Sequence, residues 1–438
     1  MGQVNVKSGI FAAVIGLCIV VAGGPVQSAA YDPHTSYVMD NFSEPYAEYP
    51  EVKAAWSAGI DLQSDEYAMG KGSAAVSGGK VYAIQKGQLV AFNVQNGKAL
   101  WKQGSKLSAP ILYQNGVIYA GSQSGTIYAV NAATGKTKWK SAVPSKAVTQ
   151  FVADQNQLLV LNGDIQAYSL TDGKYQWKDN YSAGLQQPIQ VQGNLILAAD
   201  TVSGAYSYDL LHAFDRNTGK QLWDAVNHSL PVAAGSGTLI AQRTSNILEM
   251  VPLTTLDTLD AKTGKVLKSA AYNPRKINPP DVLSNGAPAW ISGNQVYINE
   301  GPTLYSFPAD ADPQTAAKTA YSVASTDQSL VYAAGPYDGR VLFSDGERVY
   351  GIKTASQGLV TYYGGGQIAR FDLLGHGMYI ARTDGRVIAM DLISGAALLQ
   401  LKTAGPAYGP TLQESGMIIV QSKGQIQVFK EPASLKVK

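Results

Sequence analysis

Ala129-Val-Asn-Ala-Ala-Thr-Gly-Lys-Thr-Lys-Trp139 recurs as Ala213-Phe-Asp-Arg-Asn-Thr-Gly-Lys-Gln-Leu-Trp223, with Ala, Asn or Asp, Thr, Gly, Lys and Trp at the same offsets. In each copy a run of β-forming residues precedes the Asn or Asp. The small polar side chain can hydrogen-bond its own backbone in a turn, and the glycine that follows supplies a positive φ without steric cost. The pattern therefore predicts two antiparallel strands joined by a tight turn, with the tryptophan at a fixed place on the second strand.

Looser copies of this stretch occur elsewhere in the chain. One runs from Ala91 to Trp101, another runs from Ala167 to Trp177, and residues 259–265 keep the turn without a tryptophan. Successive tryptophans are spaced by 38, 38 and 46 residues (Trp101, Trp139, Trp177 and Trp223). Four short strands fit into each repeat, and a four-stranded repeat of this length is typical of a β-propeller blade.

Weaker modules without the tryptophan follow toward the C-terminal end. They are found at residues 238–267, 295–321, 340–363, 378–401 and 417–429. Counting all of them gives nine modules, whereas propellers commonly have up to eight blades. We therefore predict an all-β propeller of eight four-stranded antiparallel blades, with seven or nine blades as the alternatives.

One strand is left over at each end of the repeats. Residues 53–60 form an expected strand that carries Trp56 and has no repeat before it, while the module at 417–429 has no tryptophan strand after it. Pairing of this N-terminal strand with the C-terminal strands would complete the last blade and leave no exposed strand edge. We expect the propeller to be closed in this way.

The first 30 residues have the pattern of a secretory signal peptide. A positive charge at Lys7 precedes an apolar run at residues 10–22, and a small-residue cleavage site follows at residues 28–30. The apolar run is too short to span a bilayer. A bulky residue before Cys18 argues against lipid attachment there, which is the alternative. We expect cleavage near Ala30 and a secreted protein, extracellular or in the periplasm or cell envelope of a bacterium.

The composition is that of an all-β protein. The 438 residues include 45 glycines and 25 tyrosines, and only 15% of them are charged. The net charge of +2 gives no electrostatic reason to expect nucleic acid. Cys18 is the only cysteine in the sequence, so cleavage after Ala30 would exclude disulfides, thiolate metal sites, cysteine nucleophiles and covalently attached haem. The expected divisions are a signal peptide at 1–30, an extended lead-in at 31–52, a single propeller domain at 53–430 and a C-terminal tail at 431–438.

The consensus Ala-x-Asp/Asn-x-x-Thr-Gly-Lys-x-x-Trp resembles the tryptophan-docking motif of the PQQ-like, or quinoprotein-type, propeller repeat family. That family includes the quinoprotein alcohol dehydrogenases and the propeller lipoprotein of the bacterial outer-membrane assembly machine. The resemblance covers about residues 73–430 and implies a structural role, in which each tryptophan packs between blades. The residues of this docking motif are Trp56, Trp101, Trp139, Trp177 and Trp223, with Gly97, Gly135, Gly173, Gly219 and Gly264 in the turns.

No catalytic, cofactor-binding or metal-binding residue is predicted. The four histidines lack ligand spacing, and residues 310–312 lack the glycine and the distal glutamate of a calcium loop. The adjacent-cysteine disulfide and the haem-attachment motif of the quinoprotein dehydrogenases have no counterpart here, and their calcium ligands cannot be placed on this chain. A protein without a cofactor is therefore the favoured hypothesis, and binding of PQQ with calcium is the alternative.

Three insertions fall on consecutive repeats, at residues 200–209, 243–253 and 272–285. In a propeller, loops between second and third strands share a face with the connections between blades. Loops on a rigid scaffold are common binding sites, and Tyr, Met and Arg are enriched in interfaces. The alternative is that the insertions are tolerated and have no role. The candidate partner-binding residues are Tyr206, Tyr208, Glu249, Met250, Tyr272, Arg275 and Lys276.

The favoured function is a secreted, non-enzymatic and monomeric propeller scaffold. It would bind a protein or a polymer at the cell exterior or envelope, and it would not bind nucleic acid. The alternative function is a PQQ- and calcium-dependent sugar or alcohol dehydrogenase. No transmembrane segment is expected in the mature chain.

Overall fold

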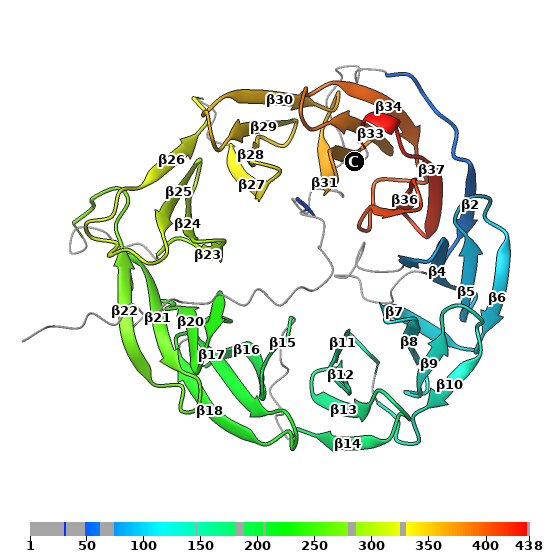
Figure 1. Ribbon diagram of the computed structural model, residues 1–438, viewed down its shortest axis with the longest axis horizontal. Coiled ribbons are helices and arrows are strands. Elements are labelled where there is room, and N and C mark those ends of the chain that lie inside the picture. The colour runs from blue at the N-terminus through cyan, green and yellow to red at the C-terminus, as the bar shows by residue number, and fades with distance from the viewer. Residues whose placement is uncertain are drawn as a thin grey trace, which may run out of the picture.

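Nine antiparallel sheets stand around a ring in the computed structural model (Figure 1). The structure describes residues 30–31, 49–61, 74–145, 147–179, 188–204, 207–246, 248–278, 286–324 and 330–435. Each sheet is one blade, and its strands follow one another from the centre of the ring outward. The prediction of an all-β propeller with four-stranded antiparallel blades is confirmed.

The first five blades each take four consecutive strands. Blade 1 consists of β3 (Ala74–Ser77), β4 (Lys80–Gln85), β5 (Gln88–Asn93) and β6 (Ala99–Gln103). Blade 2 consists of β7 (Leu107–Gln114), β8 (Val117–Ser122), β9 (Ile127–Asn131) and β10 (Thr137–Lys140). Blade 3 consists of β11 (Gln150–Asp154), β12 (Gln157–Leu161), β13 (Ile165–Ser169) and β14 (Tyr175–Lys178). Blade 4 consists of β15 (Gln190–Gln192), β16 (Leu195–Ser203), β17 (Ser207–Asp215) and β18 (Gln221–Val226). Blade 5 consists of β19 (Ala233–Gly235), β20 (Thr238–Gln242), β21 (Thr254–Asp260) and β22 (Val266–Tyr272).

Of the remaining four blades, the last two each include a strand from the N-terminal part of the chain. This strand is the fifth strand of blade 8 and the fourth strand of blade 9. Blade 6 consists of β23 (Ala289–Ser292), β24 (Gln295–Glu300), β25 (Thr303–Pro308) and β26 (Thr319–Ser322). Blade 7 consists of β27 (Val331–Tyr337), β28 (Arg340–Ser344), β29 (Arg348–Lys353) and β30 (Leu359–Tyr363). Blade 8 consists of β31 (Ile368–Leu374), β32 (Gly377–Arg382), β33 (Arg386–Asp391) and β34 (Ala397–Lys402), with β1 (Ala30–Tyr31) on the inner side. Blade 9 consists of β35 (Leu412–Glu414), β36 (Met417–Ser422), β37 (Gln425–Lys430) and β2 (Trp56–Gly59).

The predicted number of eight blades is wrong, because the modules without a docking tryptophan also form complete sheets. Blades 7 and 8 keep a central strand, β28 or β32, in which every side chain is buried. Such a strand is covered by the neighbouring blade on each side, which favours β-branched and aromatic residues. Between blades 7 and 8, Tyr362 is fully buried and its hydroxyl donates to the Leu392 carbonyl at 2.5 Å. A complete blade therefore depends on its buried central strands and does not require the tryptophan.

The turn of the repeated stretch is closed by its own polar side chain. The carboxamide oxygen of Asn131 accepts hydrogen bonds from the N–H groups of Ala133 at 3.0 Å and Thr134 at 2.9 Å. Gly135 then adopts a φ of +73°, which reverses the chain into the outer strand. The same turn is closed by carboxylates in blades 4, 5 and 8 (Asp215, Asp260 and Asp391).

The N-terminal part of the chain closes the ring, as expected. Strand β2 pairs with β37, and Trp56 lies opposite Val428 in this pair. Upstream of it, β1 pairs with β31, and the Tyr31 ring lies 5.3 Å from the ring of Phe371. Blade 9 therefore contains strands from both ends of the chain.

The C-terminal end of the described chain also packs onto the propeller. The 3-10 turn η2 (Ala433–Leu435) buries Leu435 in the core between blades 8 and 9. Residues 1–29, where the signal peptide is expected, lie outside the described residues. In the ranges that the structure describes, no helix is long and apolar enough to cross a membrane.

Candidate binding surfaces on blades 4 to 6

Five tryptophans each dock onto the turn of the next blade. Trp101 of blade 1 donates its indole N–H to the Ala132 carbonyl of blade 2 at 3.2 Å, and a Cβ on Gly135 would lie 2.6 Å from its ring. The turn glycine is therefore required by the close approach of the indole as well as by its positive φ. The same two contacts join Trp56, Trp139, Trp177 and Trp223 to the turns of Gly97, Gly173, Gly219 and Gly264.

The interface between blades 5 and 6 departs from this arrangement. Trp223 pairs with Ala213 across its blade, and a register shift follows directly. In blade 5 the same register and the same shift place Lys268 opposite Thr258. Lys268 therefore occupies the position of the docking tryptophan. The facing turn of blade 6, residues 309–318, is longer and has no glycine.

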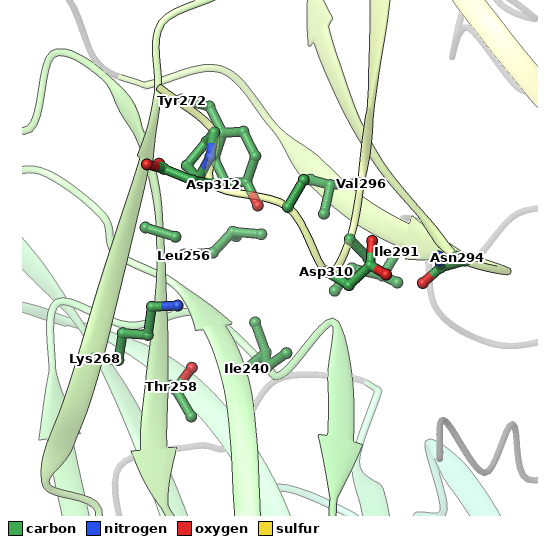
Figure 2. Close-up of a pocket in the computed structure, with 14 residues that line it drawn as sticks. Ile240, Leu256, Thr258, Lys268, Tyr272, Ile291, Asn294, Val296, Asp310 and Asp312 are labelled. Carbon is green, nitrogen blue, oxygen red and sulfur yellow. The ribbon is translucent and has the colours of Figure 1, made fainter. Parts of the chain in front are cut away.

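A cavity of about 550 Å³ lies between blades 5 and 6 beside this lysine (Figure 2). Ile240 and Leu256 line it on the side of blade 5, and Val296 and residues 309–313 line it on the side of blade 6. The Tyr272 ring lies at one end of the cavity. The volume is within the range of about 300 to 1,000 Å³ that is usual for small-ligand sites.

A second surface is formed by the loop at residues 243–253, of which the structure describes residues 243–246 and 248–253. Side chains of these residues hold the described backbone of the loop. The carboxamide oxygen of Asn246 accepts a hydrogen bond from the N–H of Leu248 at 2.7 Å. The hydroxyl oxygen of Ser245 accepts one from the N–H of Val251 at 2.8 Å. These local bonds restrict the conformations of the loop before any partner binds.

Neighbouring segments hold the same loop from both sides. The Thr244 N–H donates to the Asn227 carbonyl, which follows blade 4, at 2.8 Å. The Gly286 N–H, in the connection to blade 6, donates to the Val251 carbonyl, also at 2.8 Å. The loop is thus attached to blades on both sides of its own.

A buried ion-pair network anchors the base of this loop. Arg243 Nε donates to Asp257 Oδ2 at 2.7 Å, and His228 Nε2 lies 2.9 Å from the same oxygen. Asp257 is fully buried on β21. Burial by itself raises the pKa of the Asp257 carboxyl, but the hydrogen bonds from His228 and Arg243 outweigh it and lower the pKa from 3.8 to about 2. Asp257 therefore stays ionised and links the loop to blade 5.

A second buried histidine joins three strands of blade 4. His212 Nδ1 lies 2.7 Å from Asp224 Oδ1, and its Nε2 lies 2.9 Å from Asp200 Oδ1. Both ring nitrogens can donate to these carboxylates only when the ring is an imidazolium. Both carboxylates lie on strands adjacent to β17, so these contacts stay within blade 4. No group of three His, Cys, Asp or Glu side chains among the described residues is arranged to hold a metal ion.

The candidate partner-binding residues of the first two insertions lie in different settings. Tyr208 is half-buried in β17, opposite Val202 of a regular hairpin. Tyr206 lies outside the described residues. Glu249 accepts a hydrogen bond from the Asn227 side chain at 3.2 Å, and Met250 is 46% exposed.

The third insertion contributes both buried and exposed residues. Tyr272 is only 4% exposed and belongs to the wall of the cavity between blades 5 and 6. Arg275 is exposed and forms an ion pair of 2.5 Å with Glu300, and Lys276 is exposed beside it. Sequence reasoning missed Leu248, which is 73% exposed. Its signal is the largely apolar stretch at residues 247–253, which follows the polar stretch at residues 243–246.

Comparison with known proteins relates part of the chain to one family. Residues 85–248 match a family profile described as outer membrane protein assembly factor BamB. No curated protein matches the chain.

Among solved structures, similar folds include three that differ in origin. BamB from Moraxella catarrhalis has a TM-score of 0.46 at 15% identity, covering 86% of this chain and 99% of that chain. The computationally designed Ika8 protein has a TM-score of 0.45 at 14% identity, covering 85% of this chain and 100% of that chain. The quinohemoprotein alcohol dehydrogenase ADHIIG from Pseudomonas putida HK5 has a TM-score of 0.43 at 13% identity, covering 90% and 79%. Likeness at this level carries no information about activity or partner.

The profile match bears directly on the docking motif, because residues 85–248 include its two strict copies and both of its close ones. The repeats in this part of the chain belong to the PQQ-like propeller family, which the motif resembles.

Proposed function

We propose that this protein is a non-enzymatic propeller scaffold that binds a protein partner through a surface on blades 4 to 6. This surface consists of the loop at residues 243–253 together with Arg275 and Lys276. We also propose that the protein acts outside the cytoplasm, at the cell exterior or envelope, as the signal-peptide pattern predicts.

The observation that carries the proposal is the exposure of apolar side chains on a fixed loop. Leu248 is 73% exposed and Met250 is 46% exposed, although the backbone beside them is tied down by Asn246 and Ser245. A loop that is already ordered loses less conformational entropy on binding, so its apolar contacts contribute more to affinity. Such a loop is suited to insert its side chains into a partner.

The chemistry of the surface favours a protein over a polysaccharide. Leu248 and Met250 offer aliphatic and thioether groups, which complement hydrophobic anchors rather than sugar hydroxyls. Met and Arg are enriched in protein interfaces, and Arg275 is exposed on the adjoining connection. The family profile that residues 85–248 match is named for an assembly factor, which also supports a scaffold.

The test is site-specific photo-crosslinking in cells. A photoreactive residue replaces Leu248 in one variant and Ile393 in the control, since Ile393 is 52% exposed on the turn between β33 and β34 of blade 8. We expect a discrete protein adduct at position 248, which the substitution Met250→Ser weakens, and none at position 393. Equal adducts at both positions, or none at position 248, would overturn the proposal.

Titration of the purified protein with PQQ and calcium tests the dehydrogenase alternative. We expect no change in melting temperature at high micromolar ligand. Stoichiometric binding with a stabilisation that grows with ligand concentration, as linkage requires, would favour the dehydrogenase instead.

A further inference from the structure

We propose that the cavity between blades 5 and 6 is a receptor for an indole, supplied by a tryptophan side chain of a peptide or protein partner. This site lies on the outer part of the ring, and the proposal does not depend on the scaffold surface described above. It rests on the architecture of the five occupied docks, in which one blade supplies the indole and the next supplies a carbonyl and a turn.

The hydrogen-bond acceptor of the dock is retained in blade 6, although the turn there is longer and has no glycine. The N–H of Ala309 donates to the Asn294 carbonyl at 3.0 Å, as the N–H of Ala132 donates to the Gly116 carbonyl at 2.9 Å in blade 2. The Ala309 carbonyl therefore takes the place of the Ala132 carbonyl, which accepts the indole N–H of Trp101. No group in the described ranges donates to the Ala309 carbonyl, so an entering indole would find its acceptor unused.

The turn that would cover the indole is also held in place. The Gln314 side chain donates to the Ala271 carbonyl at 2.7 Å, and Lys318 Nζ donates to the Pro274 carbonyl. Both bonds tie the blade 6 turn to the end of β22 and to the segment after it, across the interface. The cavity therefore lies between two fixed walls, with apolar side chains and Tyr272 available to contact an aromatic ring.

This chain has no tryptophan that could fill the cavity. The sequence contains six tryptophans, and five of them occupy the docks already described. The sixth, Trp290, stacks on Tyr297 and lies 5.0 Å from the Tyr332 ring. In a second copy of the chain, the six tryptophans are engaged in the same contacts. The indole must therefore come from a different molecule.

The mouth of the cavity is polar enough to accept the peptide around such a tryptophan. Figure 2 shows Lys268 and Asp310 on opposite sides of the cavity, and both side chains are exposed. They can pair with a carboxylate and with an ammonium group near the indole. The ring itself would lie in the apolar part between Leu256 and Val296.

The interface between blades 8 and 9 provides a matched comparison. Leu399 takes the tryptophan position there, opposite Ala389 with the same register shift after it. Leu399 and the turn Ala433–Leu435 lie at this interface, beside a hollow of about 520 Å³. A tryptophan placed at 399 should thus leave the cavity between blades 5 and 6 unchanged.

The test is calorimetric titration of the full-length protein with N-acetyl-tryptophanamide, with N-acetyl-alaninamide as the control ligand. We expect saturable binding of the indole ligand with a dissociation constant of about 0.1 to 1 mM, as its size suggests. Lys268→Trp should supply an internal indole, raise the melting temperature and weaken binding of the ligand at least about tenfold. Leu399→Trp should leave the binding unchanged.

Should Lys268→Trp fail to fold, Ala270→Phe fills the same cavity from an adjacent position on β22 and should also abolish binding. The absence of binding at millimolar ligand would overturn the proposal. So would binding that persists in a folded Lys268→Trp or Ala270→Phe variant, or that is lost in Leu399→Trp alone. If position 248 gave no crosslink to a partner while indole binding was intact, only the scaffold proposal would be overturned.

Discussion

At the scale of single residues, this propeller depends on pairs that consist of a tryptophan and a turn glycine. The Trp101 indole and Gly135 show why the two occur together, because a Cβ at 135 would overlap the ring. The positive φ would by itself be acceptable to Asn or Asp at a modest energetic penalty. The ring contact excludes any side chain. Each such repeat thus has a glycine that receives the indole of the preceding blade, as Gly135 does. Shortly after the glycine it has a tryptophan that docks onto the next blade, as Trp139 does.

We expect Gly135→Ala to destabilise the protein far more than Gly116→Ala. Both glycines have a positive φ, +73° and +77°, so both substitutions carry the backbone strain of about 1 to 2 kcal/mol. Only Gly135 faces an indole, whereas a Cβ at Gly116 would meet nothing within 4 Å. The ring contact should add about 1 to 3 kcal/mol.

Denaturant unfolding of the two variants measures this difference. Equal losses of unfolding free energy would show that the indole moves aside easily, and that the docking contact contributes little to stability.

At the scale of elements, the base of the 243–253 loop is anchored by buried charge. Asp257 on β21 receives hydrogen bonds from His228 and Arg243, which lie after blade 4 and at the base of the 243–253 loop. Removing one member of such a network leaves the others buried without their partner. This network at the base of the loop helps to hold the exposed Leu248 in place for a partner.

We expect Asp257→Asn to lower the unfolding free energy by about 3 to 5 kcal/mol near neutral pH. The effect should depend on pH. A carboxyl whose pKa falls from 3.8 to about 2 on folding stabilises the protein above pH 4, and this contribution is lost as the pH falls toward 2. The stability curves of the parent and the variant should therefore converge in acid.

Urea unfolding at a series of pH values checks this expectation, with Asp310→Asn as the control at an exposed carboxylate. A constant difference between the parent and Asp257→Asn from neutral pH to pH 2 would contradict it. Limited proteolysis should find the 243–253 loop cut faster in Asp257→Asn than in the control.

At the scale of the whole molecule, stability is distributed over nine interfaces that close on themselves. Each blade contacts its two neighbours, and β2 joins the first part of the chain to the last. Many of these interfaces contain a tyrosine whose hydroxyl is buried. Tyr82 donates to the Ala132 carbonyl at 3.1 Å across blades 1 and 2, as Tyr362 does to Leu392 across blades 7 and 8.

We expect the folded protein to resist alkali until these tyrosines ionise together. Burial raises the pKa of Tyr82, Tyr168 and Tyr362 from 10.0 to about 12. A raised pKa stabilises the folded state below pH 10, and this contribution is lost as the pH rises through 12. Unfolding and ionisation should thus occur in one cooperative step.

Tyrosinate absorbance and circular dichroism, followed during the same alkaline titration, measure the two events. Ionisation of all 25 tyrosines near pH 10 with the fold intact would contradict the expectation. The urea-unfolded protein provides the reference, in which the tyrosines should titrate near their ordinary pKa.

Much of the fold could be predicted from the sequence because its signals are local. The Asn131 turn and the placement of Trp139 are set within eleven residues, by turn chemistry and by alternation along a strand. Closure by the Trp56 strand could also be inferred, since one strand remained unpaired at each end. The loops were recognised as insertions, but the burial of Tyr272 and the exposure of Leu248 depend on neighbouring blades.

What the sequence alone determined is therefore the type of blade, the positions of the docks and the way the ring closes. The tertiary structure decided the number of blades, because packing between buried central strands completes even the degenerate modules. It also decided that Asp257 meets His228, 29 residues away in the chain. The sequence shows that a lysine, Lys268, stands where other repeats have the docking tryptophan. The cavity beside Lys268 exists only because the turn of the next blade does not fill the space. Contacts between distant segments arise from the shape of the whole ring, and no local pattern encodes them.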